Sequence, residues 1–377
     1  MKFIIEKSIF IKLLSNVCNV ASKKNSDNPL ILQNIKIEAK NGTLYLTGTD
    51  ADTYIKNNTK INIEAEGVTT ISAQLIYDIV KKMEDGSEIT CQYVKDDNVF
   101  LVMSGKSKFK LMCLDAETYP NFEEQDMPIE FKILTQNFIN IIDKTRFSIS
   151  DDPGRYYLNG LFIQTVNEED GLKFCGVSTD GHRLSVIKVN GFNGKESVSG
   201  VIIPKKALPE IKKVLCSTNE EEVTIYLSKT KIKVETNDTI IISKLIDAEF
   251  PDYNRVIPTE NNKILKVNKK AITSIIDRVS TVVSDSSHRG IKFLLNKNNL
   301  LLESSSTENG FASEDMIVDF TSDESIEIGF NYKFILDIFS QIESDNVVMY
   351  FKDNSSAILI KGEEENNNIF VLMPVRI

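Results

Sequence analysis

One short segment of this 377-residue chain has residue types that could carry out nucleophilic chemistry. Ser178, Asp180 and His182 are the residue types of an acyl-transfer triad. In hydrolases, however, these groups converge from separate segments, and Ser178 lacks the G-x-S-x-G setting of a nucleophile elbow. We therefore expect Thr179-Asp180-Gly181-His182-Arg183-Leu184 to be either a hairpin turn or a recognition surface, and the sequence alone does not choose between them.

A second segment imitates a phosphate-binding loop. Ser104-Gly105-Lys106-Ser107 resembles the end of a P-loop, but Phe100 stands where the motif requires its first glycine. Apolar residues alternate on both sides of the segment, which is typical of strands joined by a hairpin. We interpret the match as chance.

The sequence has few residues in patterns that bind metals or cofactors. The chain has only two histidines, His182 and His288, and no Cys/His spacing typical of zinc sites. Its five cysteines are scattered, odd in number and without a C-x-x-C pair, so we expect small buried side chains in a reducing compartment. The sequence thus predicts no metal, no cofactor and no enzymatic activity.

The elements that position these residues are repeated three times. Asp115-Ala116-Glu117, followed by Tyr119-Pro120, returns 132 residues later as Asp247-Ala248-Glu249-Phe250-Pro251. Each repeat has a helical segment, a Ser/Asp loop, alternating strands, a second helical segment and further strands. The six predicted helices are 7–24, 74–83, 135–147, 205–216, 268–280 and 331–342.

So long a period indicates duplicated domains, because solenoid repeats are much shorter. The boundaries near 127 and 259 predict three domains, 1–127, 128–259 and 260–377. Asn41-Gly42 predicts a tight hairpin between two alternating strands. The fold class is therefore α+β: three tandem copies of a domain with two helices on antiparallel sheet, and no pattern of parallel βαβ winding.

Charge is unevenly distributed between the helices and the rest of the chain. The formal net charge is -10, from 44 basic and 54 acidic residues. The six predicted helices contain 16 basic and 5 acidic residues, which leaves 28 basic and 49 acidic residues elsewhere. A local positive surface on an acidic protein suits sequence-independent attraction to phosphate. The alternative is that lysine is simply common on solvated helix faces.

No stretch of the sequence is long and apolar enough to span a membrane. Charged residues interrupt the apolar N-terminal segment 3–12, which argues against a signal peptide. We therefore expect a cytoplasmic protein with no membrane partner.

Several sequence blocks, in a fixed order, resemble the bacterial sliding-clamp family, the beta subunits of DNA polymerase III. The resemblance runs over the whole chain. Its blocks are Met1-Lys2-Phe3, Leu46-Thr47-Gly48-Thr49-Asp50, Arg155-Tyr156-Tyr157-Leu158-Asn159-Gly160, Thr179–Leu184, Ser243-Lys244-Leu245, Phe250-Pro251-Asp252-Tyr253, Ile328-Gly329-Phe330-Asn331 and Met373-Pro374-Val375-Arg376-Ile377.

The resemblance implies a head-to-tail homodimer. Its six domains would form a ring around duplex DNA, with sheets outside and helices lining the pore, and would confer processivity on the replicative polymerase without reading sequence. A head-to-tail interface uses two different surfaces and must close to avoid a filament. The implied interface residues are Lys106, Lys108, Phe109, Val282, Val283, Glu314 and Asp315.

Sequence-independent DNA contacts are expected from basic residues on the helices, since lysine meets phosphate as a flexible point charge. The candidates are Lys12, Lys23, Lys24, Lys81, Lys82, Lys144, Arg146, Lys205, Lys206, Lys212, Lys213, Lys269, Lys270 and Arg278. By resemblance, Arg155, Tyr156 and Tyr157 also contact DNA. The acidic pair Asp151-Asp152 before that segment departs from the family pattern and weakens that expectation.

The resemblance also implies a groove between the second and third domains that binds short motifs of the polymerase catalytic subunit, the clamp loader and repair proteins. An apolar pocket can hold such a motif through a few buried side chains. The implied residues are Leu158, Thr179, Gly181, His182, Arg183, Leu184, Pro251, Arg255, Val256, Asn331, Phe334, Val371, Met373, Pro374, Val375 and Arg376.

The chain departs from the family at Phe334 (usually tyrosine), Ser355 (usually apolar) and His288 (usually aromatic), so its motif preference can differ. Two rival functions remain at this point: a monomeric three-domain peptide adaptor, and a hydrolase that depends on His182.

Overall fold

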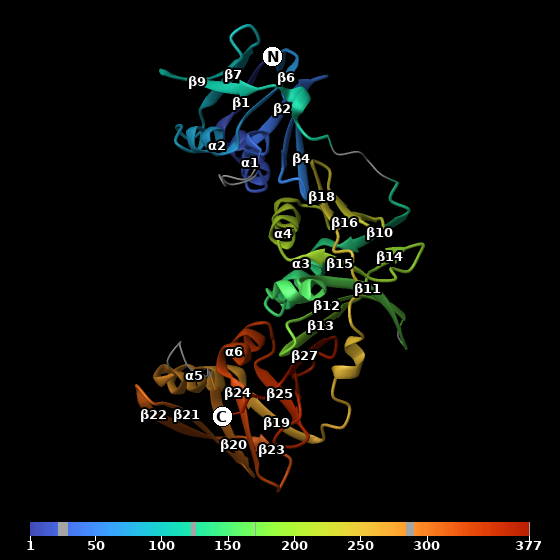
Figure 1. Ribbon diagram of the computed structural model, residues 1–377, viewed down its shortest axis with the longest axis vertical. Helices are drawn as coiled ribbons and strands as arrows, with labels where there is room; N and C mark the ends of the chain where they lie inside the picture. The colour runs from blue at the N-terminus through green and yellow to red at the C-terminus, as the bar shows by residue number, and fades with distance from the viewer. Residues whose placement is uncertain (22–28, 122–125, 170, 284–289, 377) are drawn as a thin grey trace. The chain divides into compact units, whose positions relative to one another are not determined.

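The computed structural model describes residues 1–21, 29–121, 126–169, 171–283 and 290–376 (Figure 1). The chain forms two compact units. The first comprises Met1–Ile139, Asn193–Ser197 and Lys206–Leu245, and the second comprises Asn140–Phe192, Val198–Lys205 and Ile246–Ile377. Since the middle repeat contributes to both, the units do not coincide with the three repeats.

The same order of elements occurs three times. The first repeat contains β1 (Lys2–Glu6), α1 (Lys7–Cys18), η1 (Leu30–Gln33), β2 (Asn34–Lys40), β3 (Thr43–Thr49), β4 (Thr53–Lys60), β5 (Ile63–Ala65), β6 (Gly67–Ser72), α2 (Ala73–Lys81), β7 (Glu88–Val94), β8 (Val99–Ser104), β9 (Ser107–Leu114) and η2 (Ala116–Thr118). The second contains β10 (Ile129–Leu134), α3 (Thr135–Arg146), η3 (Pro153–Leu158), β11 (Gly160–Glu168), β12 (Gly171–Thr179), β13 (Arg183–Val189), β14 (Asn193–Gly194), β15 (Val201–Pro204), α4 (Leu208–Ser217), β16 (Glu222–Leu227), β17 (Lys231–Glu235), β18 (Thr239–Lys244) and η4 (Tyr253–Val256). The third contains β19 (Lys263–Asn268), α5 (Lys269–Val279), η5 (Ser280–Val282), β20 (Gly290–Asn296), β21 (Asn299–Ser306), β22 (Gly310–Ile317), β23 (Asp319–Phe320), β24 (Ile326–Asn331), α6 (Tyr332–Ser340), β25 (Asn346–Phe351), β26 (Ile358–Gly362) and β27 (Asn368–Leu372).

All six predicted helices are present, and each is shorter than its predicted range. Helix α1 ends at Cys18, and α4 begins at Leu208, so Lys205 and Lys206 precede it. Asn268 and Asn331 cap α5 and α6, because their side chains accept hydrogen bonds from the first-turn amides of Ala271 and Lys333. The helical periodicity thus located the helices, whereas the caps set their first residues.

Every strand pairing within the described residues is antiparallel, as expected for the α+β class. The predicted hairpin joins β2 to β3, with Asn41 at φ 52° and Gly42 at φ 71°. Two consecutive positive φ angles are typical of a type I′ turn, which matches the twist of the flanking strands. Helices α1 and α2 lie side by side, as do α5 and α6 (Figure 1).

Two pairings join strands of different repeats. Strand β18 of the second repeat pairs with β4 of the first, and β27 of the third pairs with β13 of the second. The result is one 14-stranded and one 9-stranded sheet, beside a 4-stranded sheet ordered β22-β21-β20-β24. Backbone hydrogen bonds therefore cross each border between repeats.

The cysteines differ in part from the expectation of uniform burial. Cys91, Cys113 and Cys175 are buried and Cys18 is half-buried, but Cys216 on α4 is exposed. Burial raises the pKa of Cys18 to about 12 and that of Cys175 to about 11. The thiolate is the reactive form, so these thiols are unreactive near neutral pH. No helix among the described residues is long and apolar enough to cross a membrane, and these residues include no cluster of metal-binding side chains.

Labelling of native protein with Ellman's reagent at pH 8 should therefore modify one thiol rapidly and the other four only after denaturation. The fast phase should vanish in Cys216→Ser. Fast modification of two or more thiols per chain in the native wild type would contradict the burial of the other four cysteines.

Candidate functional site

The segment that resembled a catalytic triad is a hairpin turn between β12 and β13. The Thr179 hydroxyl accepts from the Gly181 amide at 3.0 Å and donates to the Arg183 carbonyl at 2.7 Å. One Asp180 carboxylate oxygen accepts from the amides of His182 and Arg183. Ser178 is fully buried, and its hydroxyl contacts the Thr145 carbonyl and the Ser148 hydroxyl. A buried serine bonded in this way does not act as a nucleophile, so the hydrolase alternative has no structural basis.

A groove of about 260 Å³ adjoins this turn. Its lining residues all belong to the second compact unit and come from both the second and the third repeat. They are Arg155, Tyr157, Leu158, Thr179, Gly181, His182, Arg183, Leu184, Phe250, Pro251, Asp252, Tyr253, Val256, Val371 and Met373.

Ten of the predicted groove residues line this groove, namely Leu158, Thr179, Gly181, His182, Arg183, Leu184, Pro251, Val256, Val371 and Met373. Phe334 lies beside it, since its ring faces that of His182 with centroids 6.4 Å apart. Pro374, Val375 and Arg376 line a neighbouring hollow with Lys292 and Glu327. Arg255 is largely exposed and pairs with Asp252. Asn331 caps α6 instead of lining the groove.

The floor of the groove is part of the hydrophobic core. Leu158, Leu184 and Val371 belong to the same buried cluster as Phe250 and Tyr253. The Tyr253 hydroxyl accepts a hydrogen bond from the Gln164 amide at 2.7 Å, and burial raises the pKa of this tyrosine. Because the floor is fixed by packing, the groove exists before any ligand enters it.

The C-terminal segment forms one wall and is held by backbone hydrogen bonds. The Met373 amide donates to the His182 carbonyl at 2.8 Å, and the Val375 amide donates to the Gly329 carbonyl at 2.8 Å. The segment thereby connects the β12–β13 turn to β24 of the third repeat.

Five lining residues were not predicted for the groove. Arg155 and Tyr157 were assigned to DNA, but both line the groove, and the Arg155 side chain lies over Gly181. Phe250, Asp252 and Tyr253 are the others. Their signal was present in the sequence, because they surround Pro251 in one of the blocks that carry the resemblance.

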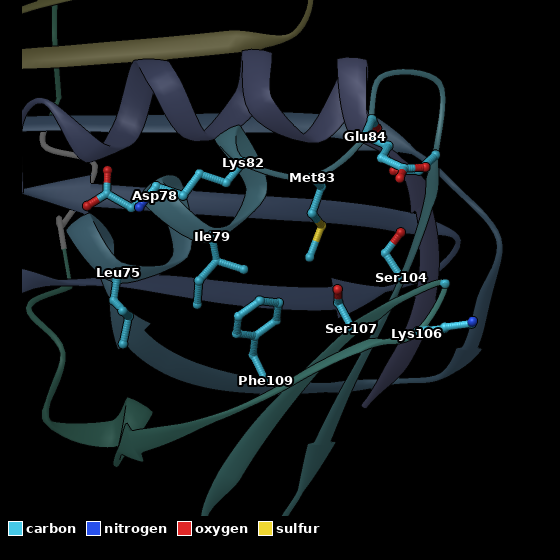
Figure 2. A pocket seen from close by; sticks show the side chains of 12 residues that line it. Leu75, Asp78, Ile79, Lys82, Met83, Glu84, Ser104, Lys106, Ser107 and Phe109 are labelled. Atoms are coloured by element: carbon cyan, nitrogen blue, oxygen red, sulfur yellow. Dashed lines mark hydrogen bonds between the residues drawn. The ribbon is translucent and has the colours of Figure 1, made fainter.

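A second hollow, of about 790 Å³, lies between α2 and the β8–β9 turn of the first repeat. Leu75, Ile79, Met83 and Phe109 give it apolar surface. Figure 2 shows the side chains of Ile79 and Phe109 turned toward one another, whereas Lys106 points away. The Ser104–Ser107 segment is the turn of this hairpin, which confirms that it is no P-loop.

Six of the basic residues predicted to meet phosphate bond to other groups of the chain. Lys144 is buried and pairs with Glu343, Lys205 with Asp151, Lys206 with Asp52, and Arg278 with Glu314. Lys213 and Lys269 donate to the carbonyls of Ser15 and Ile342. Lys12, Lys81, Lys82, Arg146 and Lys270 are exposed, whereas Lys212 is half-buried. Lys23 and Lys24 lie outside the described residues.

The chain matches three family models. The model described as DNA polymerase III beta subunit, N-terminal domain, covers residues 1–123; the central-domain model covers 132–252 and the C-terminal-domain model 254–376.

Curated relatives named "Beta sliding clamp" match over all of both chains. Identity is 34% for Caulobacter vibrioides and 30% for Escherichia coli. Among solved structures, a sliding clamp from Bartonella birtlesii bound to griselimycin superposes with a TM-score of 0.94 at 36% identity and covers both chains completely. A Caulobacter crescentus clamp, with PEG bound to a "putative beta-motif tethering region", has the same TM-score at 34% identity, over 100% of this chain and 99% of that one.

Gly181 is the position of the groove where a side chain is least tolerated. Its φ is +89°, and a Cβ there would lie 2.5 Å from Nη1 of Arg155. Gly181→Ala should therefore lower the free energy of unfolding by about 1–2 kcal/mol, measured by urea denaturation.

The matched control is Ala51→Gly in the equivalent turn of the first repeat. Ala51 has a φ of 75°, so glycine there relieves strain and should not lower stability. Equal losses in both variants would show that the left-handed conformation is not what selects glycine.

Proposed function

Since the chain belongs to the family of bacterial DNA polymerase III beta subunits, the DNA sliding clamps, we propose that two copies close head to tail into a ring around duplex DNA. The family is the non-catalytic processivity factor of the polymerase. We propose domains 1–127, 128–259 and 260–377; the three matched ranges support them, although the second boundary lies a few residues inside the third match. Replication takes place in the cytoplasm of bacteria, and we place the protein there.

The observation that carries the proposed ring is the repeated pairing across domain borders. Each domain has two antiparallel meanders, and the first meander is β2–β3–β4 in the first domain and β11–β12–β13 in the second. In both junctions the last strand of this first meander (β4 or β13) pairs with the last strand of the next domain (β18 or β27). The strands left over by this rule are β22 and β9, whose outer edges pair with nothing among the described residues beyond a short contact of β9 with β6. Unpaired edges favour pairing with another chain, so β22 of one copy would join β9 of the next.

The two edges also match in side chains. Phe109 and Met112 on β9 and Phe311 and Ile317 on β22 are large apolar side chains exposed to solvent. Lysines at 106, 108 and 110 face the solvent on the β9 side, whereas β22 presents an exposed Asp315. Glu314 already pairs with Arg278 of its own chain, so we assign the attraction between copies to Asp315.

The hollow beside Phe109 supplies the rest of the interface. Val282 and Val283 follow α5 in the third domain and are half-buried apolar residues. In a head-to-tail dimer they would enter the hollow lined by Leu75, Ile79 and Met83 (Figure 2). This packing would repeat that of α1 with α4 between the first and second domains.

Phe109→Glu should convert the dimer into monomers, because it places a carboxylate in this apolar interface. Light scattering should give about twice the chain mass of 42.5 kDa for the wild type and about that mass for the variant. Leu172→Glu, an exposed apolar residue on β12, is the matched control and should remain dimeric. A wild-type mass of one chain at micromolar concentration would instead favour the monomeric adaptor.

A ring holds DNA by topology, so its interactions with phosphate can be weak and blind to sequence. We propose that Lys12, Lys81, Lys82, Arg146 and Lys270 make these interactions, because they are exposed and carry no carboxylate partner among the described ion pairs. Lys205, Lys206 and Arg278 are neutralised by neighbouring carboxylates and would contribute less.

The decisive experiment compares DNA with and without ends. After loading by the clamp loader, the protein should stay on nicked circular DNA through gel filtration and escape once the circle is linearised. Equal retention on both forms would contradict topological holding. Replacing exposed lysines by glutamine should lower the slope of log affinity against log salt by about 1 for each phosphate that the protein no longer neutralises.

We further propose that the groove binds short peptide motifs of the polymerase, the clamp loader and repair proteins. Its fixed apolar floor and polar rim suit a peptide anchored by a few buried side chains. The relative from Bartonella birtlesii was solved with griselimycin bound, and we expect this chain to bind griselimycin as well.

A further inference from the structure

Arg183 was predicted to bind peptide, but its guanidinium group is hydrogen-bonded to other residues of the same chain. Only 10% of this side chain is exposed. Nε donates to Asp180 at 3.0 Å, Nη1 donates to Oδ2 of Asp337 at 2.6 Å, and Nη2 donates to the carbonyl of Phe147 at 2.5 Å. Each of its three nitrogens therefore already has an acceptor.

Two aromatic rings complete the surroundings of the guanidinium. Its central carbon lies 4.1 Å from the ring centroid of Phe334 and 5.0 Å from that of Phe147. The planar guanidinium thus makes both ionic and stacking interactions, which a lysine cannot reproduce.

These interactions connect elements of two domains within one compact unit. Phe147 follows α3 of the second domain, whereas Phe334 and Asp337 belong to α6 of the third. Phe334 in turn faces His182 in the groove. Arg183 thus connects α6 directly to the β12–β13 turn.

The other junction, between the first and second domains, lacks this arrangement. Its β3–β4 turn repeats the hydrogen bonds of the β12–β13 turn, with Thr49 and Asp50 in the roles of Thr179 and Asp180. The Thr53 amide donates to Asp50 as the Arg183 amide does to Asp180, and Glu210-Ile211 on α4 corresponds in the sequence repeat to Asp337-Ile338 on α6. Oε2 of Glu210 has no hydrogen-bond partner within the described structure. The arginine–carboxylate pair is thus specific to the junction that has the groove.

We propose that Arg183 is a positioning residue that acts through Asp337: the pair holds α6 and Phe334 against the β12–β13 turn, and so sets peptide affinity through the placement of Phe334 and not through hydrogen bonds from the guanidinium to the peptide. The inference rests on the proposed peptide function of the groove.

The test measures binding of a fluorescein-labelled clamp-binding peptide from the polymerase of the same cell by fluorescence polarisation. Asp337→Asn should weaken binding by about 3- to 30-fold, although Asp337 is absent from the groove lining. Arg183→Lys should weaken binding similarly. Because both changes break the same pair, the Asp337→Asn/Arg183→Lys double variant should have an affinity within about twofold of the lower of the two single-variant affinities. Asp337→Glu should restore most of the affinity.

Asp323→Asn is the matched control, because it removes an exposed ion pair with Lys297 in the same domain and should leave affinity unchanged. A reporter separates positioning from a general loss of stability. The chain contains no tryptophan, so Phe334→Trp gives one emission signal. Asp337→Asn in that background should shift its emission maximum before peptide is added, with the dimer intact.

Wild-type affinity in Asp337→Asn, together with loss of binding in Arg183→Lys, would overturn the inference and show that Arg183 touches the peptide directly. No binding by the wild type would instead reject the peptide function of the groove. Additive losses in the double variant would also count against action through Asp337.

Discussion

The structure depends above all on backbone pairing at the borders between domains. A strand edge exposes unpaired amides and carbonyls, and burying them without partners costs free energy. Pairing β4 with β18 and β13 with β27 satisfies these groups and fixes the register between consecutive domains. Among the described residues, the same pairing rule leaves β22 without a partner on one side and β9 with only a short contact to β6. A second copy that pairs with these two edges would therefore repeat, between chains, the strand pairing that joins the domains within the chain.

The two internal junctions share a backbone but differ in their side chains. At the first, Asp52 pairs with Lys206 and Lys244, and these hydrogen bonds hold the pKa of its carboxyl below the ordinary range. At the second, His182 and Met373 stand at the equivalent hydrogen-bonded positions, and a groove opens beside them. Duplication supplied two equivalent turns. Charged side chains pair with one another at the first turn, whereas a groove with an apolar floor adjoins the second.

Ion pairs within the chain reduce the positive charge that the helices present to solvent. Basic residues are more frequent on the helices than elsewhere, but Lys144 and Arg278 are neutralised by carboxylates of neighbouring elements. The positive surface available to phosphate is therefore smaller than the sequence count suggests. Weak attraction suits a protein that must slide, because strong attraction would slow its movement along DNA.

Local sequence determined the repeat, the six helices and the Asn41-Gly42 turn, because periodicity, duplication and positive-φ residues act over short distances along the chain. The family blocks also placed Leu158, the 179–184 turn and Val371 at one groove. Only the tertiary structure decided which partner each side chain bonds to. In the folded chain Arg155 and Tyr157 line the groove, Lys144 is buried, and Arg183 bonds to Asp337, which is 154 residues away in sequence. Such contacts depend on which domains share a sheet, and the pattern of residues near each partner in the sequence does not predict them.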